Sequence, residues 1–218
     1  VAGMGADLFE SYVGSIIATI ALAAVGASFF GSSLIADSFD NSFFVLPILV
    51  AGIGIISAII GTFLVRTSEQ ANMGRLLWAL RTGILSAGGL VLLGTGIAVV
   101  TLGLDFNLFW VVVTGLAAGT IIGIASEYFT SYEFRPTKWL ARQALTGPAT
   151  VIIGGFGLGM LSALIPMVAI VIAIWIANWL AGLYGIALAT VGMLSTLGIT
   201  LATDAYGPVA DNAGGIAE

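Results

Sequence analysis

The sequence predicts an all-α protein that forms a polytopic bundle of transmembrane helices. Of its 218 residues, 59% are hydrophobic and only 8% are charged, and the mean hydropathy is +1.14. An average soluble domain has about 25% charged residues. Cysteine and histidine are both absent. Disulfides, thiolates and imidazole groups are therefore excluded, and the available chemistry is that of carboxylates, hydroxyls and amides.

Six apolar stretches are long enough to cross the hydrocarbon core, which takes about 20 helical residues each. We expect one transmembrane domain over residues 1–218, with spans at about 5–30, 43–65, 76–103, 108–129, 148–180 and 183–207. In chain order, the connections are 31–42, 66–75, 104–107, 131–147 and a tight turn at Gly182. Because these connections are short, neighbouring helices should be antiparallel. Thr146 and Pro148 are typical of the start of the fifth span, since Thr can cap a helix and Pro is tolerated in its first turn.

The basic residues are confined to two connections. They are Arg66, Arg75 and Arg81 around the second connection and Arg135, Lys138 and Arg142 in the fourth. Positive residues mark the cytoplasmic side, and six crossings return the chain to the side where it began. We therefore expect residues 1–4, 66–75, 131–147 and 208–218 on the cytoplasmic side of a prokaryotic plasma membrane. The fourth connection also carries aromatic residues, which is typical of a segment at the membrane interface.

The chain has 30 glycines, many at short spacing within the apolar stretches. Pairs such as Gly52 and Gly54, or Gly115 and Gly119, predict close approach of neighbouring helices in lipid. The glycine-rich run at 154–159 is no phosphate-binding loop, because it lacks both a preceding strand and the Lys-Ser/Thr of a Walker motif. Packing is the favoured interpretation of this run as well.

The acids near the end of the chain are the first candidate functional residues. Asp204, Asp211 and Glu218 recur every seven residues, which leaves them within about 40° of one line along a helix. A charged side chain in lipid costs roughly 2.5–3.5 kcal/mol, so such residues usually mark an ion or substrate path. Small neighbours surround Asp211 and Asn212, and oxygen ligands of this kind suit Mg²⁺ that bridges to phosphate.

A second acidic group lies at the start of the first span. Asp7 and Glu10 are three residues apart and share one helix face, and Ser11 adds a hydroxyl next to them. These oxygen ligands suit a small cation or a proton on an ion path. The alternative is a solvated helix start, where the macrodipole favours acids. The apolar and small residues around the pair favour the ion path.

The remaining polar residues are weaker candidates. Glu127 and Glu133 flank the basic connection, where we expect them to be solvated or paired with Arg135 or Lys138. A surface pair of this kind contributes about 0–1 kcal/mol. Asn178 reads as an interfacial anchor on the outer side.

Both end motifs resemble those of the membrane-integral, ion-pumping inorganic pyrophosphatases. Residues 1–12 (VAGMGADLFESY) and 204–218 (DAYGPVADNAGGIAE) are similar to the sixth and eleventh transmembrane helices of that family. Residues 127–131 and 146–150 resemble its connection into the tenth helix. The resemblance implies a homodimer of 16-helix subunits that hydrolyses Mg-pyrophosphate on the cytoplasmic side and drives Na⁺ or H⁺ outward.

The same resemblance implies that the chain is part of a longer protein. Two of the six helices that build the family's site are expected here, so most catalytic residues should lie outside this sequence and the piece alone should be inactive. The chain also begins within a motif, and Glu218 follows no helix terminator such as Gly or a basic last turn.

The resemblance also assigns roles to single residues. Asp211, with Asn212 beside it, falls on the Mg-pyrophosphate site as a metal ligand, and Asp204 falls between that site and the ion gate. The gate itself is matched by Asp7, Glu10 and Ser11. Glu218 receives no role.

The resemblance favours one transported ion but leaves a second one open. The position of Glu10 is similar to that in Na⁺ pumps, whereas plant-type proton pumps carry the acid where this chain has Gly14, so Na⁺ is favoured and H⁺ stays open. Mg²⁺ is the expected cofactor, with K⁺ and Na⁺ as candidate activators, and the determinant of K⁺ dependence falls outside the chain.

Two further hypotheses stand beside this one. A secondary transporter would also place isolated carboxylates in Gly- and Pro-interrupted helices, where they bind a coupling cation. A purely structural scaffold leaves the acids in the apolar helices unexplained. The expected partners are pyrophosphate, the transported ion, the lipid bilayer and a second subunit, and no nucleic acid.

Overall fold

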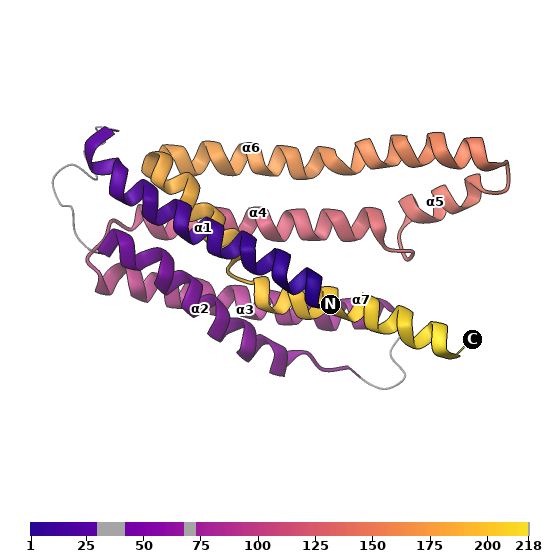
Figure 1. The fold of residues 1–218 in the computed structure, drawn as a ribbon, viewed down its shortest axis with the longest axis horizontal. Coiled ribbons are helices and arrows are strands. Elements are labelled where there is room, and N and C mark those ends of the chain that lie inside the picture. Colours follow the sequence, from indigo (N-terminus) through magenta and orange to yellow (C-terminus); the bar gives the residue numbers. More distant parts are fainter. Residues whose placement is uncertain (30–41, 68–72, 218) are drawn as a thin grey trace.

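The computed structural model describes residues 1–29, 42–67 and 73–217, and this part of the chain is an elongated bundle of helices without strands (Figure 1). The helices are α1 (Ala2–Phe29), α2 (Ser42–Leu64), α3 (Met73–Thr101), α4 (Asn107–Thr130), α5 (Arg135–Gln143), α6 (Pro148–Leu194) and α7 (Leu197–Ala217). The all-α prediction is confirmed. Four acids of the chain lie outside the described residues, namely Asp37, Asp40, Glu69 and Glu218.

The first four helices follow the apolar stretches of the sequence closely. α1, α2, α3 and α4 each begin and end within three residues of the expected limits. Among the described residues, five stretches are long and apolar enough to cross a membrane by length and composition. Each such helix satisfies its backbone hydrogen bonds internally, which is the requirement that lipid imposes on any segment that spans it.

The last of these stretches, Pro148–Ala217, is divided by a sharp reversal. Ala181 (φ −150°, ψ 26°) and Gly182 (φ 59°, ψ −149°) leave the helical region, so α6 folds back into two antiparallel arms (Figure 1). The positive φ of Gly182 favours glycine, which has no Cβ to clash there. The turn expected at Gly182 is thus confirmed.

The final helix extends beyond the last expected apolar span. The second arm of α6 ends at Leu194, two residues break the helix, and α7 then continues to Ala217, ten residues past the expected limit at 207. At the break, the Ser195 hydroxyl donates to the Gly192 carbonyl at 2.6 Å. Pro208 lies inside α7 without ending it. Residues 208–217 are therefore helical too, and a Pro inside a helix is tolerated in transmembrane segments.

The start of α6 corrects a second detail. Pro148 occupies the first turn as expected, but the cap position belongs to Gly147 (φ 127°), with no capping side chain. Thr146 instead shares a hydroxyl–hydroxyl hydrogen bond of 2.7 Å with Thr150. The extended glycine conformation places Thr146 one residue too early to cap the helix.

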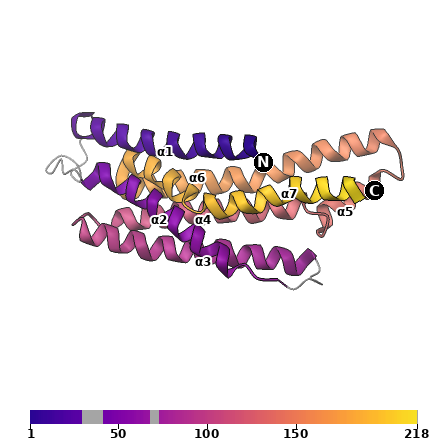
Figure 2. The same ribbon diagram turned by 60° about the horizontal axis from the view of Figure 1, so that its bottom comes forward.

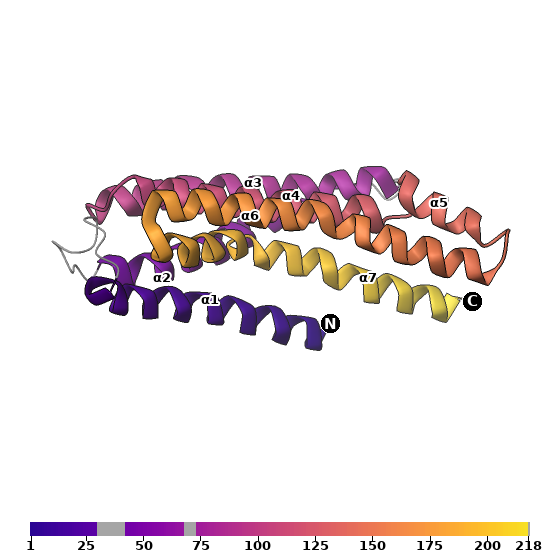
Figure 3. The ribbon, with the colours of Figure 1, turned by 90° about the horizontal axis from the view of Figure 1, so that it is seen from above.

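The basic segments gather at one end of the bundle. The end of α2, the start of α3 and all of α5 lie toward the same end as both chain termini, whereas the α3–α4 turn and the reversal in α6 lie at the other (Figures 1 and 3). The two groups of basic residues therefore share one end, as the alternation of basic and non-basic connections predicts.

Close backbone contact joins α4 to the second arm of α6. A Cβ added to Gly115 would collide with the Ala189 carbonyl oxygen, and one added to Gly192 would lie 2.8 Å from the Val112 carbonyl oxygen. Gly119 faces Met193 in the same way. The prediction that Gly115 and Gly119 mediate close helix approach is confirmed.

The other predicted glycine contacts are only partly found. Gly54 of α2 contacts the Ser195 carbonyl at the break before α7, whereas Gly52 has nothing near it. In the run at 154–159, Gly154 faces Trp139 and Leu140 of α5. Its glycines at 155, 157 and 159 meet open space within the described part of the chain.

Two buried tyrosines tie α1 and α6 to α2. The Tyr12 hydroxyl donates to the Ala51 carbonyl at 3.2 Å, and the Tyr184 hydroxyl donates to the Phe43 carbonyl at 2.9 Å. Buried tyrosine hydroxyls usually find such a partner. These bonds fix how α1 and the second arm of α6 are rotated against α2.

We expect Gly115→Ala to lower the thermal stability of the protein, because its methyl group would overlap the Ala189 backbone. Overpacking of this kind costs roughly 1–3 kcal/mol. The matched control on the same helix is Gly123→Ala, since a Cβ at Gly123 meets nothing within 4 Å. Thermal unfolding in detergent, followed by intrinsic fluorescence, should show a lower Tm for Gly115→Ala only. Equal Tm values for the two variants would contradict the close approach.

Candidate functional site

The acids of α1 lie on the face that points away from the rest of the chain. Tyr12, Thr19 and Ala23 form the buried face of this helix. At 100° per residue, Asp7 and Glu10 lie about 140–160° around the helix from Tyr12, and both are exposed. The Tyr12 bond to α2 therefore sets the direction in which this acid pair points.

Ser11 lies at the edge of that open face and is also exposed. The hydroxyls further along α1 have a different arrangement, because they bond to their own helix. Ser15 donates to the Tyr12 carbonyl and Thr19 to the Ser15 carbonyl, both at 2.7 Å. Such internal bonds satisfy hydroxyls in apolar helices. Of these hydroxyls, that of Ser11 is the one nearest the acid pair in sequence.

The acids of α7 are presented in a similar way. Ile199, near the start of this helix, is 1% exposed and packs with Ala58 of α2 and Ala87 of α3. Asp204, Asp211 and Asn212 follow on the part of α7 that leaves this contact, and all are exposed. The start of the helix is thus anchored, while its acidic part is open.

α1 and α7 bring the two acidic groups onto neighbouring helices. The helices contact one another and run in opposite directions (Figures 2 and 3). The acids come from the two ends of the described sequence, so only the tertiary fold makes the helices that carry them neighbours. Within the described residues, however, no three acidic side chains converge to hold a metal ion.

The donor set at Asp211 and Asn212 fits Mg²⁺ in kind. Protein sites for this ion commonly use one or two carboxylates, together with substrate phosphates and several waters. A Cβ added to Gly207, Gly214 or Gly215 meets nothing within 4 Å, so the surroundings are open. Asp211 has the carboxylate chemistry that such a site uses.

Glu127 pairs with Arg81, and is neither solvated nor paired with Arg135 or Lys138 as expected. Its carboxylate Oε2 lies 2.9 Å from Nη2 of Arg81, whose Nε donates to the same oxygen at 3.0 Å. The pair links α3 to α4, with side chains 27% and 23% exposed. The expected partners lie elsewhere, since Arg135 and Lys138 belong to α5, where Lys138 donates to the Glu133 carbonyl at 2.7 Å.

The missed pairing had a weak signal in the sequence. Arg81 lies near the start of the third apolar stretch and Glu127 near the end of the fourth, each inside the expected limits. Antiparallel neighbours place these positions at one end of the bundle, and both charges need compensation in lipid. The tyrosine bonds to α2 had no comparable signal, because a carbonyl acceptor can lie anywhere along an apolar helix.

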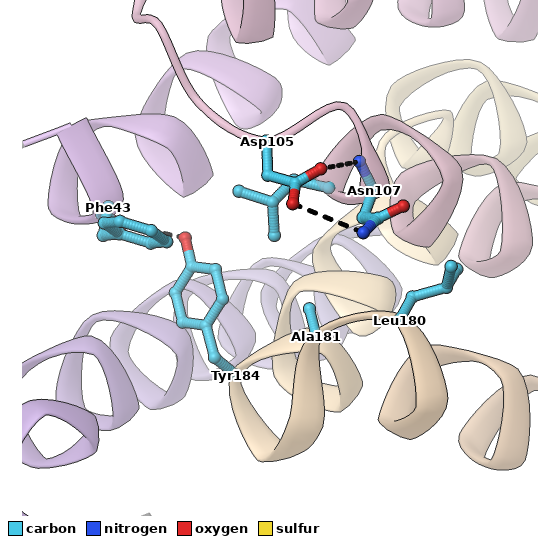
Figure 4. A pocket seen from close by; sticks show the side chains of 7 residues that line it. Phe43, Asp105, Asn107, Leu180, Ala181 and Tyr184 are labelled. Atoms are coloured by element: carbon cyan, nitrogen blue, oxygen red, sulfur yellow. Dashed lines mark hydrogen bonds between the residues drawn. The ribbon is translucent and has the colours of Figure 1, made fainter. Parts of the chain in front are cut away.

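A pocket lies at the end of the bundle away from the basic segments, and it does not resemble a substrate site. It lies between the α3–α4 turn and the reversal of α6, and its volume is about 20 Å³ (Figure 4). That is room for about one water molecule. Asp105 in its wall accepts hydrogen bonds from the Asn107 backbone and side chain at 2.9 and 3.3 Å. Asp105 therefore stabilises the start of α4 by accepting these hydrogen bonds.

Comparison with known proteins identifies close relatives over the whole chain. The family model described as "Inorganic H+ pyrophosphatase" matches residues 1–218. A protein of Bacteroides thetaiotaomicron named "Putative K(+)-stimulated pyrophosphate-energized sodium pump" is 51% identical over 100% of this chain and 31% of its own length. A protein of Clostridium tetani with the same name is 43% identical, over 32% of its length.

A more distant relative carries a different name. The "K(+)-insensitive pyrophosphate-energized proton pump 2" of Moorella thermoacetica is 38% identical over 100% of this chain and 32% of its own length. The chain thus spans about a third of the length of the curated relatives that it matches.

We expect Arg81→Gln to lower the Tm more than Glu133→Gln, an exposed control. Loss of Arg81 leaves a half-buried carboxylate whose Oε1 already lacks a hydrogen-bond partner among the described residues. The double variant Arg81→Gln/Glu127→Gln should recover part of the loss, because it removes the uncompensated charge. A double-mutant cycle on thermal unfolding should give a coupling of about 1 kcal/mol. A coupling near zero would contradict the pairing.

Proposed function

The chain belongs to the inorganic H⁺ pyrophosphatase family, and from this premise we propose that it forms part of a membrane pump driven by pyrophosphate. The pump hydrolyses inorganic pyrophosphate to phosphate and moves Na⁺ or H⁺ outward across the membrane. In this proposal the chain supplies six crossings of a longer subunit, which acts as a homodimer.

The observation that supports this function best is the pairing of α1 with α7. Each helix carries acids in an apolar segment, each turns those acids away from the residues that anchor it, and the two helices contact one another. Lipid exposure of a charged side chain is costly. The acidic faces therefore suit a polar interior whose remaining walls come from other helices of the longer protein.

In this proposal the acids of the two helices have different roles. Asp211, with Asn212 beside it, binds Mg-pyrophosphate, while Asp7, Glu10 and Ser11 form the ion gate. Asp204 lies on the path between them. Asp211 would hold Mg²⁺, which would supply neutralisation of the phosphate charge and orientation of the phosphoryl group toward an attacking water. The carboxylates that activate this water belong to parts of the pump outside the chain.

Two features support Na⁺ as the transported ion. Glu10 lies where the resembling Na⁺ pumps place their acid, whereas the plant-type proton-pump position is Gly14. The relatives at 51% and 43% identity are named as K⁺-stimulated sodium pumps, and one at 38% is named as a K⁺-insensitive proton pump. We therefore extend the proposal to stimulation by K⁺. In the proposed pump, the basic end of the bundle faces the cytoplasm.

We expect inverted vesicles that contain the longer protein to hydrolyse pyrophosphate in the presence of Mg²⁺ and to accumulate ²²Na⁺. Both activities should rise when K⁺ is added, and removal of Mg²⁺ with a chelator should abolish both. Proton uptake without ²²Na⁺ uptake would exclude Na⁺ as the ion. Gradient-driven exchange without any hydrolysis of pyrophosphate would contradict the pump and favour a secondary transporter.

A sharper expectation concerns Glu10→Gln. This variant should lose ²²Na⁺ uptake by at least about tenfold, on the order of 1.4 kcal/mol, because it removes the charge that the gate offers to a cation. Pyrophosphate binding, measured by calorimetry, should change less than about twofold. Glu133→Gln is the matched control, since it removes an exposed acid outside the proposed path. Equal loss of transport and binding would place Glu10 outside the gate.

A further inference from the structure

One face of α5 combines all three of its basic side chains with its tryptophan. Arg135, Lys138, Trp139 and Arg142 are at positions i, i+3, i+4 and i+7, which fall on one side of a helix. All four side chains are exposed, Trp139 to 48%. We name these four residues the basic face of α5.

The opposite side of α5 is held against the bundle. The Thr137 hydroxyl donates to the Phe129 carbonyl of α4 at 3.2 Å. Leu140 lies against Gly154 of α6, where an added Cβ would come within 3.4 Å of its Cδ1. Trp139, at the edge of the basic face, also lies against Gly154, since an added Cβ would come within 3.3 Å of its ring, but the indole stays 48% exposed. The helix is thus fixed in rotation with its three cations exposed.

The cations of the basic face have no acidic partner within residues 1–29, 42–67 and 73–217. The salt bridge formed in this part of the chain joins Arg81 to Glu127. Lys138 bonds to a neutral carbonyl, that of Glu133. Three positive charges on one short helix repel one another unless a partner compensates them, so the arrangement calls for an anion.

The place of α5 in the bundle indicates which kind of anion suits its basic face. The helix lies at the basic end, between the end of α4 at Thr130 and the start of α6 at Pro148 (Figure 1). Both neighbours are membrane-spanning by length and composition, so α5 lies at the level where the apolar spans stop. Exposed Tyr132 (58%) and Leu145 (88%) flank it, and aromatic residues are enriched at this level of a membrane.

From this arrangement we propose that the basic face of α5 binds the headgroups of anionic phospholipids. Arg135 and Arg142 donate to the phosphate oxygens, an interaction for which the planar guanidinium is well suited. Lys138 adds a third charge, and Trp139 and Leu145 contact the upper acyl chains. A free phosphate would use the charges but would leave these apolar groups in water. Lipid uses both.

The number of basic residues on α5 sets the expected gain in affinity for anionic lipid. Each basic residue near an anionic leaflet raises affinity about fivefold, so three together should contribute on the order of 100-fold. The binding should be weakened by salt, since exposed charges are screened over about 8 Å at physiological ionic strength.

The test uses the longer protein, purified in detergent and supplied with equal amounts of phosphatidylglycerol and phosphatidylcholine. Native mass spectrometry counts the lipids of each type that remain bound. The wild type should retain phosphatidylglycerol preferentially, and Arg135→Gln/Lys138→Gln/Arg142→Gln should lose at least tenfold of that preference. Arg135→Lys/Arg142→Lys keeps the charge and should retain most of it. Arg66→Gln, at the same end but outside α5, should behave as the wild type.

Thermal unfolding in phosphatidylcholine nanodiscs shows whether the triple variant is folded, and its Tm should equal that of the wild type. Unchanged phosphatidylglycerol retention in the triple variant would overturn the proposal. So would displacement of the lipid by millimolar pyrophosphate, which would indicate a site for free phosphates. A lower Tm of the triple variant without any lipid preference in the wild type would show that another polypeptide segment covers the basic face.

Discussion

The close contact between α4 and the second arm of α6 is the constraint on which the described structure depends. Gly115 and Gly192 let the two backbones meet almost without side chains between them. Such contact replaces the hydrophobic driving force that lipid cannot supply between helices. It fixes the reversal at Gly182 against the bundle and so determines where the break at Ser195 lies. Since α7 leaves the bundle from that break, its direction follows from the same contact.

The acidic faces of α1 and α7 are a consequence of this anchoring. α1 is rotated by the Tyr12 bond to α2, and α7 starts from the buried Ile199 between α2 and α3. In both helices the residues that pack and the residues that carry charge lie on different sides or in different parts. The acids of α1 and α7 therefore lie outside the packed contacts of the bundle. This division explains why the acids gather no metal-binding cluster among the described residues.

The charges at the basic end are treated in two different ways. Arg81 lies within the apolar level, where lipid would penalise it, and it is compensated by Glu127 on the adjacent helix. The cations of α5 lie where the spans stop and remain without a carboxylate in the described part of the chain. Depth in the bundle, rather than the type of residue, decides which arginine needs an internal partner, because the cost of a charge falls toward the membrane surface.

The sequence by itself determined the helical class, the limits of the first four helices, the turn at Gly182 and the candidate acids. These follow from local properties, namely apolar length, the missing Cβ of glycine and the cost of charge in lipid. The last apolar span expected from the sequence stops at 207, whereas α7 continues to Ala217 with Pro208 inside it. Only the tertiary structure decided that Glu127 pairs with Arg81 and that α1 lies against α7. Those contacts join residues far apart in the chain, and their geometry depends on how closely the backbones approach, which no local pattern encodes.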